Sequence, residues 1–434
     1  MSKLEEYATY KKIDISWIDE IPTHWELKTI KALFEERKEM NYPIKTRNIL
    51  SLCMYRGVIP YSEKGNSGNR SKDDITAYKL AYPNDIVLNS MNVIAGSVGL
   101  SKYFGVVSPV YYMLKKRNLE DSIEFLNYVF RTETFQKSLI GLGNGILVKK
   151  SESTGKLNTI RLRIPMIKLN RVELPYPPTE EQIKLASFLD EKTAQIDKVI
   201  SQKEKLIELL KEQKQIIITE TVTKGLNKDV EFVNSSVKWI GEVPKGWDII
   251  IAKHVLRKLE RPRKKNGNTV ICSNHGYSKL LGDVNQGLVS LTQHDYQGVD
   301  KGDLLVHGMD AWHGAISISK HSGDCTSVVH VCDSKHNKIY IAYFLKMLAI
   351  MNVYKVISNG VRQNTSDFRS WQKFGDIQLL LPPKEEQNQI ADFIEKKTTE
   401  INQAIELQQN YILKLKEYKA SLIDSVVTGK VRVA

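Results

Sequence analysis

The sequence has few of the features that mark membrane, exported or disulfide-stabilised proteins. Its 434 residues contain only four cysteines, Cys53, Cys272, Cys325 and Cys332, and their scattered spacing is not that of a disulfide framework. No apolar run approaches the roughly 20 residues of a membrane span, and the N-terminal stretch has no apolar core of an export signal. These absences predict a cytoplasmic chain with no membrane segment.

Catalytic motifs are also scarce. The sequence has no GxxxxGK[ST] phosphate loop, no glycine-rich dinucleotide loop after a strand, and no acidic cluster spaced as in a metal-dependent nuclease. The stretch "PYPPT" resembles the motif of amino-methyltransferases, but it lacks the acidic or amide residue that would bind the amino group. We therefore expect no catalytic residues in this chain, and a stand-alone DNA methyltransferase or nuclease is an alternative that the missing motifs disfavour.

The charge balance indicates a polyanionic partner. The formal net charge is +13, while 41% hydrophobic residues are enough for packed cores in two to four domains. A strongly basic chain of this kind most simply binds nucleic acid. A basic protein without such a partner is the alternative on charge alone.

The chain is a tandem duplication. "PPTEEQIKLASFLDEKTAQID" (177–197) returns as "PPKEEQNQIADFIEKKTTEIN" (382–402), with ten of 21 positions identical at an offset of 205. "WIDEIPTHW" (17–25) returns as "WIGEVPKGW" (239–247), and "NDIVLNSMNVIAGSVGLS" (84–101) as "GDLLVHGMDAWHGAISIS" (302–319). Each copy is thus a variable part followed by a constant part.

The constant parts are predicted to be long helices. No proline or glycine occurs between Thr179 and Gly225, and Thr179 with Gln182 fits a capping box. An apolar seam on so charged a helix must be covered, and an antiparallel coiled coil of the two copies would place the polar residues Lys203 and Gln408 close together. The alternative is that each helix packs only on its own globular domain. The seam positions are Leu189, Ile196, Lys203, Leu210 and Ile217 in the first copy, and Ile394, Ile401, Gln408, Leu415 and Leu422 in the second.

The variable parts are predicted to be α+β modules. In each, β-rich runs such as "DIVLNSMN" and "DLLVHGMD" meet a turn at Gly96 or Gly314, and further strands follow. The stretches "IEFLNYVFRTETFQKSLI" and "IYIAYFLKMLAIMNVYKVI" are each predicted to form one amphipathic helix. The fold class expected is therefore α+β: two mixed modules joined by two long antiparallel helices, with pseudo-twofold duplication.

One group of potential zinc ligands lies in the second copy. Zinc could use four of the residues His321, Cys325, His330, Cys332 and His336. Their spacing is not of the paired CxxC type, and the corresponding stretch of the first copy contains no Cys or His. His330 and Cys332 alternate along a predicted strand, so a core or surface role is favoured and no metal ligand is assigned.

The two WIxExPxxW segments, the two PPxEEQ helix starts and the two "VT" helix ends resemble the specificity subunit of type I restriction–modification systems, in the family's order and over nearly the whole chain. The resemblance implies two target-recognition domains that each read half of a bipartite double-stranded DNA site. It also implies helices that set the gap between the halves and dock two methyltransferase subunits. Restriction (translocase) subunits would join, and S-adenosylmethionine, ATP and Mg²⁺ would belong to the partner subunits.

This interpretation divides the chain at the repeat boundaries. The first recognition domain with its N-terminal segment covers 1–178, the central helix 179–224, a linker 225–238, the second recognition domain 239–383 and the C-terminal helix 384–434. A coiled-coil scaffold that binds no DNA is the remaining alternative.

The loops that differ between the copies are where DNA contacts are expected. They mix Arg, Lys, Asn, Gln, Ser and Tyr, the side chains that reach phosphates and base edges, although a solvated loop has the same composition. From loop chemistry alone we expect contacts from Tyr55, Arg56, Lys64, Asn69, Arg70, Lys149 and Lys150 in the first module, and from Asn274, His275, Tyr277, Lys279, Arg362, Gln363, Asn364 and Arg369 in the second.

Overall fold

The structure is a computed structural model, and it forms two compact units. Unit 1 comprises Met1–Gln202 and Asn410–Ala434, and unit 2 comprises Lys203–Gln409. The boundary falls inside both long helices, so each unit contains part of each. The residues that the structure describes are 5–54, 56–65, 74–146, 161–237, 239–264, 268–283, 296–357 and 368–433.

Each unit contains a four-stranded antiparallel sheet with the same order of strands. The first and second strands of the sheet come from the beginning and the middle of the module, and the third and fourth form a hairpin around the glycine turn. Gly96 and Gly314 both have a positive φ, of 83° and 86°, so the turn predicted at these matched glycines is confirmed. The sheet is β4 (Phe34–Arg37), β11 (Tyr111–Lys116), β8 (Ile86–Asn89) and β9 (Val98–Leu100) in unit 1, and β18 (Leu256–Lys258), β25 (Val329–Ser334), β22 (Leu304–His307) and β23 (Ile316–Ile318) in unit 2.

Four shorter antiparallel pairs surround each sheet in the same pattern, and unit 1 has one more, β12 (Asn144–Ile146) with β13 (Arg161–Arg163), which has no counterpart among the described residues of unit 2. One pair closes the Trp–Pro–Trp segment, one ties the start of the module to its end, and two cover a face of the sheet. In unit 1 these are β1 (Tyr10–Ile15) with β2 (Ile18–Pro22), β3 (Glu26–Thr29) with β14 (Glu173–Tyr176), β5 (Leu50–Cys53) with β6 (Gly57–Pro60), and β7 (Lys79–Ala81) with β10 (Gly105–Val107). In unit 2 they are β15 (Phe232–Asn234) with β16 (Glu242–Pro244), β17 (Asp248–Ile251) with β26 (Gln378–Leu381), β19 (Val270–Cys272) with β20 (Ser278–Leu280), and β21 (Tyr296–Val299) with β24 (Gly323–Thr326).

Alternate residues of the central strand pack on opposite faces of the sheet. In β22, Leu304 and Val306 join the core formed by α7 (Lys338–Ile350) and the long helices, whereas Leu305 joins the core beneath the β19–β20 pair. Val87 of β8 takes the corresponding place in unit 1, in a core with Leu50 and Val58 of the β5–β6 hairpin. Helices therefore cover one face of each sheet and hairpins the other, which confirms the predicted α+β class.

The two predicted amphipathic helices are each broken in two. The prediction of one helix over residues 123–140 is wrong, because Thr132 has extended backbone angles and its hydroxyl accepts the N–H of Phe135, which ends α2 (Ile123–Arg131) and starts α3 (Glu133–Ser138). In unit 2 the break falls at Met351 and Asn352, where Asn352 has a φ of 57°. The helices there are α7 and α8 (Val353–Ile357).

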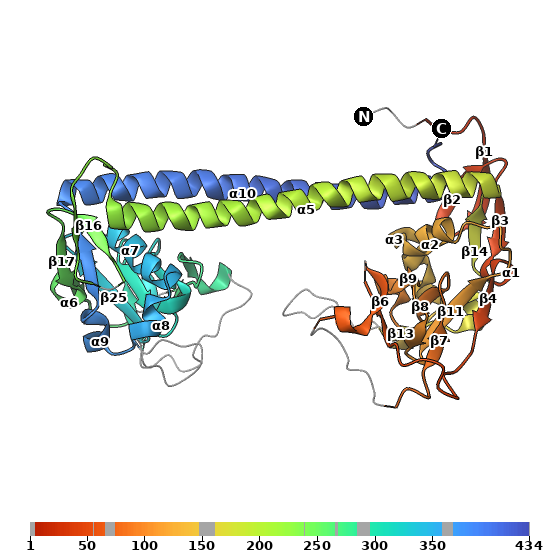
Figure 1. Cartoon of the computed structure of the whole chain (residues 1–434), viewed down its shortest axis with the longest axis horizontal. Helices are drawn as coiled ribbons and strands as arrows, with labels where there is room; N and C mark the ends of the chain where they lie inside the picture. The colour runs from red at the N-terminus through yellow and green to blue at the C-terminus, as the bar shows by residue number, and fades with distance from the viewer. Residues whose placement is uncertain are drawn as a thin grey trace. The chain divides into compact units, whose positions relative to one another are not determined.

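Two long helices, α5 (Thr179–Lys224) and α10 (Lys384–Val427), pair within each unit (Figure 1). In unit 2, Lys203 Nζ donates to Gln408 Oε1 at 2.8 Å and Lys214 Nζ donates to Asn402 Oδ1 at 2.9 Å, so the helices run antiparallel. In unit 1, Lys419 Nζ contacts both oxygens of Asp197 at 2.6 and 2.7 Å. Across the described residues, neither these helices nor any other is apolar enough over a sufficient length to cross a membrane.

The paired faces follow a heptad pattern with two rows of inward residues per helix. All ten seam positions expected from the sequence are buried or half-buried. The sequence interpretation missed the second row, which lies three or four residues from the first and contains several polar side chains. The second row is Ala186, Thr193, Ile200, Ile207, Lys214 and Thr221 in α5, and Ala391, Thr398, Ile405, Ile412, Lys419 and Val426 in α10.

The glutamine of the first PPxEEQ motif links the start of α5 to the recognition module. Gln182 Oε1 accepts the N–H of Ser122, the N-cap of α2, at 3.1 Å, and its Nε2 donates to the carbonyl of Pro177 at 2.9 Å. Thr179 is the first helical residue, so the capping box predicted for Thr179 and Gln182 is not formed as expected. The Gln182 side chain instead accepts a hydrogen bond at the start of α2.

The same glutamine recurs in unit 2 with the same bonds. Gln387 Oε1 accepts the N–H of Asn337, the N-cap of α7, at 3.0 Å, and its Nε2 donates to the carbonyl of Pro382 at 2.8 Å. A glutamine suits this position because its amide accepts at one atom and donates at the other. The motif therefore fixes each module helix to a long helix.

The second glutamate of each motif holds the Trp–Pro–Trp segment. Glu181 accepts from Tyr7 at 2.5 Å and lies 2.8 Å from His24 Nε2, whereas Glu386 accepts the indole N–H of Trp247 at 3.0 Å. The repeated motifs thus interact with one another inside each unit.

A glycine after α10 is required by the close approach of the Trp–Pro–Trp segment. Gly429 has a φ of 75°, and a Cβ there would lie 2.3 Å from Pro22 Cδ and 3.1 Å from the Trp25 ring. We expect Gly429→Ala to lower the free energy of unfolding by about 2–4 kcal/mol, because the strain at positive φ adds to overpacking. Guanidinium unfolding followed by tryptophan fluorescence would measure it.

The matched control for this prediction is Gly65→Ala. Gly65 has a nearly equal φ of 73° in the same unit, but nothing lies within 4 Å of a Cβ there. This control should cost only about 1 kcal/mol. Equal losses for the two variants would show that the contact with Pro22 has no effect.

Candidate nucleic-acid interface

Seven of the fifteen expected DNA contacts lie among the described residues. The other eight, Tyr55, Asn69, Arg70, Lys149, Lys150, Arg362, Gln363 and Asn364, lie outside them. The described seven come from three places: the turn after β5 with the short helix that follows β6, the turn between β19 and β20 together with β20 itself, and the segment that begins at Phe368.

In unit 1 the β5–β6 hairpin brings two of the expected residues together. Arg56 is exposed in the turn, and its guanidinium contacts the carbonyl of Glu63 at 3.1 Å and the carboxylate of Glu63 at 3.5 Å. Lys64 ends the same short helix, η1 (Tyr61–Glu63), with its Nζ 5.2 Å from the ring centroid of Tyr61. Both members of the Arg56–Glu63 pair are more than half exposed. Such a pair contributes little stability, so the guanidinium could exchange Glu63 for a phosphate.

In unit 2 the equivalent turn is longer and carries three of the expected residues, and a fourth, Lys279, lies on the adjoining strand β20. Cys272 pairs with Ser278 at its base, so the turn holds residues 273–277, whereas Cys53 pairs with Gly57 in unit 1 and leaves only 54–56. Asn274, His275 and Tyr277 are exposed at this turn. The rings of His275 and Tyr277 stack with centroids 6.2 Å apart, and Lys279 Nζ lies 4.8 Å from the Tyr277 ring. Amide, imidazole, phenol and ammonium groups are therefore presented together.

Arg369 follows an anchored residue. The N–H of Phe368 donates to the carbonyl of Gly308, and His330 Nε2 lies 2.6 Å from the carbonyl of Phe368. A Cβ at Gly308 would lie 3.0 Å from Arg369 Cα, so glycine permits this approach. Burial lowers the pKa of His330, which keeps the imidazole neutral beside the Phe374 ring.

Unit 1 has the same anchor built from different residues. The N–H of Ile164 donates to the carbonyl of Ser90, and the Tyr112 hydroxyl donates to the carbonyl of Ile164 at 3.1 Å. In each unit the anchored residue lies just beyond a segment in which contacts are expected. His330 therefore has a structural role equivalent to that of Tyr112.

The remaining members of the Cys/His group do not form a metal site. Cys325 and Cys332 are fully buried in cores on opposite faces of the sheet, and burial raises the pKa of the Cys325 thiol to about 12. Among the described residues, which include all five members of the group, no three His, Cys, Asp or Glu side chains are placed to hold a metal ion. His330 and Cys332 share a face of β25, as their alternation predicted.

Three residues beside the β19–β20 turn were missed by the sequence interpretation. The rings of Trp312 and His313 lie 3.5 Å apart on η6 (Ala311–His313), and Lys355 Nζ lies 4.8 Å from the Trp312 ring. A Cβ at Gly314 would lie 3.7 Å from the carbonyl of Asn274, so this turn lies beside the predicted contact turn. The available signal was that Trp312 and His313 replace Ile94 and Ala95 in a block that is otherwise similar between the copies.

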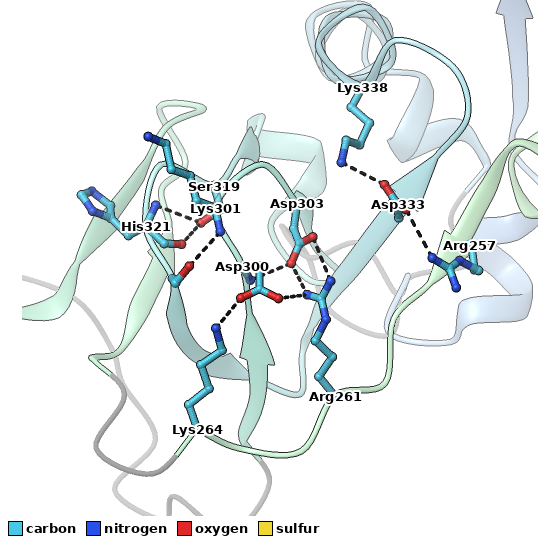
Figure 2. A network of polar contacts seen from close by, with 11 residues as sticks. Arg257, Arg261, Lys264, Asp300, Lys301, Asp303, Ser319, His321, Asp333 and Lys338 are labelled. Carbon is cyan, nitrogen blue, oxygen red and sulfur yellow. Dashed lines mark hydrogen bonds and ion pairs between the residues drawn. The ribbon is translucent and has the colours of Figure 1, made fainter.

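An ionic network joins the start of β22 to the segment that follows β18. Figure 2 shows the Arg261 guanidinium bound to both oxygens of Asp303, while Asp303 also accepts the N–H of Asp300 at 2.7 Å. Asp303 is only 4% exposed. Arg37 and Asp85 form the same bidentate pair in unit 1, at 2.8 and 3.2 Å. Because the pair recurs in both units, it belongs to the scaffold rather than to the variable surface.

Comparisons with known proteins bear on the whole chain, although no protein-family model matches it. The protein assigned as the specificity subunit of the type I restriction enzyme MjaX from Methanocaldococcus jannaschii is 23% identical over 455 residues. That match covers 98% of this chain and 97% of the relative. The MjaVIII type I specificity subunit of the same organism is 23% identical over 373 residues, covering 81% of this chain and 80% of the relative.

Solved structures show the same fold. A chain from a structure on complex assembly and conformational transition of the type I R-M system has a TM-score of 0.66 at 11% identity, covering 95% of this chain and 99% of its own. The HsdS subunit from Thermoanaerobacter tengcongensis has a TM-score of 0.52 at 13% identity, covering 95% and 98%. The resemblance indicated by the two WIxExPxxW segments and the two PPxEEQ helix starts is therefore confirmed, and this chain is a relative of the specificity subunits of type I restriction–modification systems.

Proposed function

We propose that this chain is the non-catalytic DNA-specificity subunit of a cytoplasmic type I restriction–modification complex. Residues 1–178 and 239–383 are the two target-recognition domains, and each reads one half of a bipartite double-stranded DNA site. Residues 179–224 and 384–434 are the helices that set the spacer between the halves, and 225–238 link the copies.

One observation carries the proposal that the two halves of the site differ. Both units have the same four-stranded sheet and an equivalent hairpin beside it, yet the turn of this hairpin has three residues in unit 1 and five in unit 2. Specificity resides in loops held by a rigid scaffold. Two like scaffolds with unlike turns would read two unlike sequences, whereas identical modules would read a palindrome.

The charge and the side chains of these turns suit DNA. Phosphate contacts by Lys and Arg supply affinity that is independent of sequence, in keeping with the net charge of +13. Asn274, His275 and Tyr277 are exposed groups that can reach base edges. We extend the interface to His313 and Lys355, because both are exposed beside the same turn.

The long helices would also dock the partner subunits. In unit 2, α5 exposes Leu206, Leu209 and Ile216, which lie on one side of its seam at spacings of three and seven residues. Exposed apolar stripes of this kind mark protein interfaces. Two methyltransferase subunits are the proposed occupants, with restriction subunits joining them. S-adenosylmethionine, ATP and Mg²⁺ would be bound by those partners.

Reconstitution with the methyltransferase subunits tests this function. Methylation should appear only when the chain is present, at one asymmetric bipartite sequence in a library of random duplexes. DNA binding should also weaken steeply with salt, because counterions are released when phosphates are contacted.

Other outcomes would assign other functions. Uniform binding by the complete assembly, with no preferred sequence, would refute a specificity role. Weak DNA binding that is insensitive to salt would indicate a scaffold, and methylation or cleavage by the isolated chain would indicate an enzyme.

A further inference from the structure

A lysine of α7 contacts the backbone of the turn at residues 273–277. Lys346 Nζ donates to the carbonyl of Gly276 at 2.9 Å and lies 5.0 Å from the ring centroid of Tyr343, one turn earlier on the same helix. The turn is also closed on itself, since the N–H of Ser273 donates to the carbonyl of Tyr277. Lys346 therefore ties the tip of the turn to the helix that packs against the sheet.

Gly276 is shaped for this contact in two ways. Its φ is 75°, which favours glycine, and a Cβ there would lie 2.8 Å from Lys346 Cε and 3.0 Å from Lys346 Nζ. The same Cβ would lie 3.4 Å from the carbonyl of Gly314. The turn is thus seated between Lys346 and the η6 turn, and a side chain at Gly276 would displace it.

The surroundings of Lys346 make its charge unfavourable for stability. The pKa of Lys346 is lowered to about 8: desolvation is the largest cause and Lys214 on α5 acts in the same direction, while Cys272 on β19 and Glu395 on α10 act in the opposite direction. Because the folded-state pKa is below the ordinary value of 10.5, the charged form at pH 7 reduces stability, and this loss is relieved as pH rises above about 8. A hydrophobic residue would suit the site better if packing were the only requirement.

We propose that Lys346 is a positioning residue that holds the turn at residues 273–277 in the conformation that reads the second half-site. This inference rests on the proposed function, and it assigns the turn's specificity to a side chain that does not itself contact DNA. In unit 1 the equivalent position of α2 holds Arg131, which is exposed, and the equivalent turn has only three residues.

Lys346→Met tests the proposal in the full chain, with Lys338→Met as the matched control. Lys338 lies on the same helix, but its Nζ pairs with Asp333 at 2.9 Å and not with the turn. Duplexes selected from a random-sequence pool should show two half-sites for the wild type and for Lys338→Met. Lys346→Met should keep the first half-site and lose at least about tenfold in discrimination at the second, as expected when one or two base contacts are misplaced.

Two further measurements separate positioning from general damage. Amide hydrogen exchange in residues 273–277, measured without DNA, should become faster in Lys346→Met but not in Lys338→Met. The melting temperature of Lys346→Met should stay equal to that of the wild type or rise, because an unfavourable charge is removed.

A second variant tests the same contact from the turn. Gly276→Ala should reduce discrimination at the second half-site to a similar extent, and the double variant should be no worse than either single variant if both act on one contact.

A failure of the positioning role of Lys346 can be distinguished from a failure of the proposed function. If Lys346→Met selects both half-sites like the wild type, or loses both together with a lower melting temperature, the positioning role is wrong. If the wild type itself selects no sequence, the proposed function fails, and unchanged exchange in residues 273–277 would then also overturn the role of Lys346.

Discussion

Insertion of one heptad into each long helix, after Lys203 in α5 and after Gln408 in α10, is expected to abolish methylation at the original site and create a new one. Seven residues keep both seam rows in phase and lengthen each helix by roughly 10 Å. The new target should contain the same two half-sites with a spacer longer by roughly three base pairs, at about 3.4 Å per pair. Modification of the original site should fall at least about a hundredfold, because one half-site loses several base contacts of about 1–3 kcal/mol each.

The control for the insertions is a heptad in only one helix. Beyond a one-sided insertion, contacts such as Lys214–Asn402 and Lys419–Asp197 can no longer both form. This variant should lose the original target without gaining a new one. Methylation at an unchanged spacer after the matched insertions would show that helix length does not set the distance between the half-sites.

Asp303→Ala is expected to be strongly destabilising for unit 2. It leaves the Arg261 guanidinium without its bidentate partner and removes the acceptor of the Asp300 N–H. Breaking a buried ion pair in this way costs about 2–4 kcal/mol, since Arg261 is about one-third exposed and water compensates in part. Denaturant unfolding or a fall in melting temperature would measure the loss.

Asp333→Ala provides the comparison in the same network (Figure 2). Asp333 pairs with Lys338 at 2.9 Å and with Arg257 at 3.3 Å, but its side chain is 38% exposed. Exposed pairs contribute at most about 1 kcal/mol. A loss for Asp303→Ala no larger than that for Asp333→Ala would contradict the role assigned to the buried pair.

The long helices could be predicted because their signals are local and repeated. A run without proline or glycine and a row of apolar residues every seven positions fix a helix and one side of its seam. The second row was missed because Thr193, Lys214 and Lys419 occupy inward positions without being apolar. Lys214 and Lys419 find partners on the facing helix, so the polar residues are accommodated by contacts that no single helix reveals.

The details of the modules depend on contacts between distant segments. Gln182, for example, bonds to Ser122, 60 residues away. The helix boundary at Thr132 is different: its cap is a local bond to Phe135, and a threonine within an apolar periodic run was taken as helix interior although it also suits an N-cap. Strands of three to six residues are likewise defined by their partners more than by their own pattern.

The interface was only partly accessible to sequence reasoning. Loop composition selected Asn274, His275 and Tyr277, which the structure exposes on one turn. It could not select Lys346, because a lysine in an apolar helix carries no sign of the loop that it contacts. Trp312 and His313 were overlooked because they lie within a block that aligns between the copies.

The methylome of the host, compared with and without this chain, tests most directly whether two different target-recognition domains act as one unit. The account predicts a single asymmetric bipartite motif, with both parts separated by a fixed number of unread base pairs, and its complete loss when the chain is deleted. A palindromic motif, a continuous motif, or a methylation pattern unchanged by the deletion would contradict it.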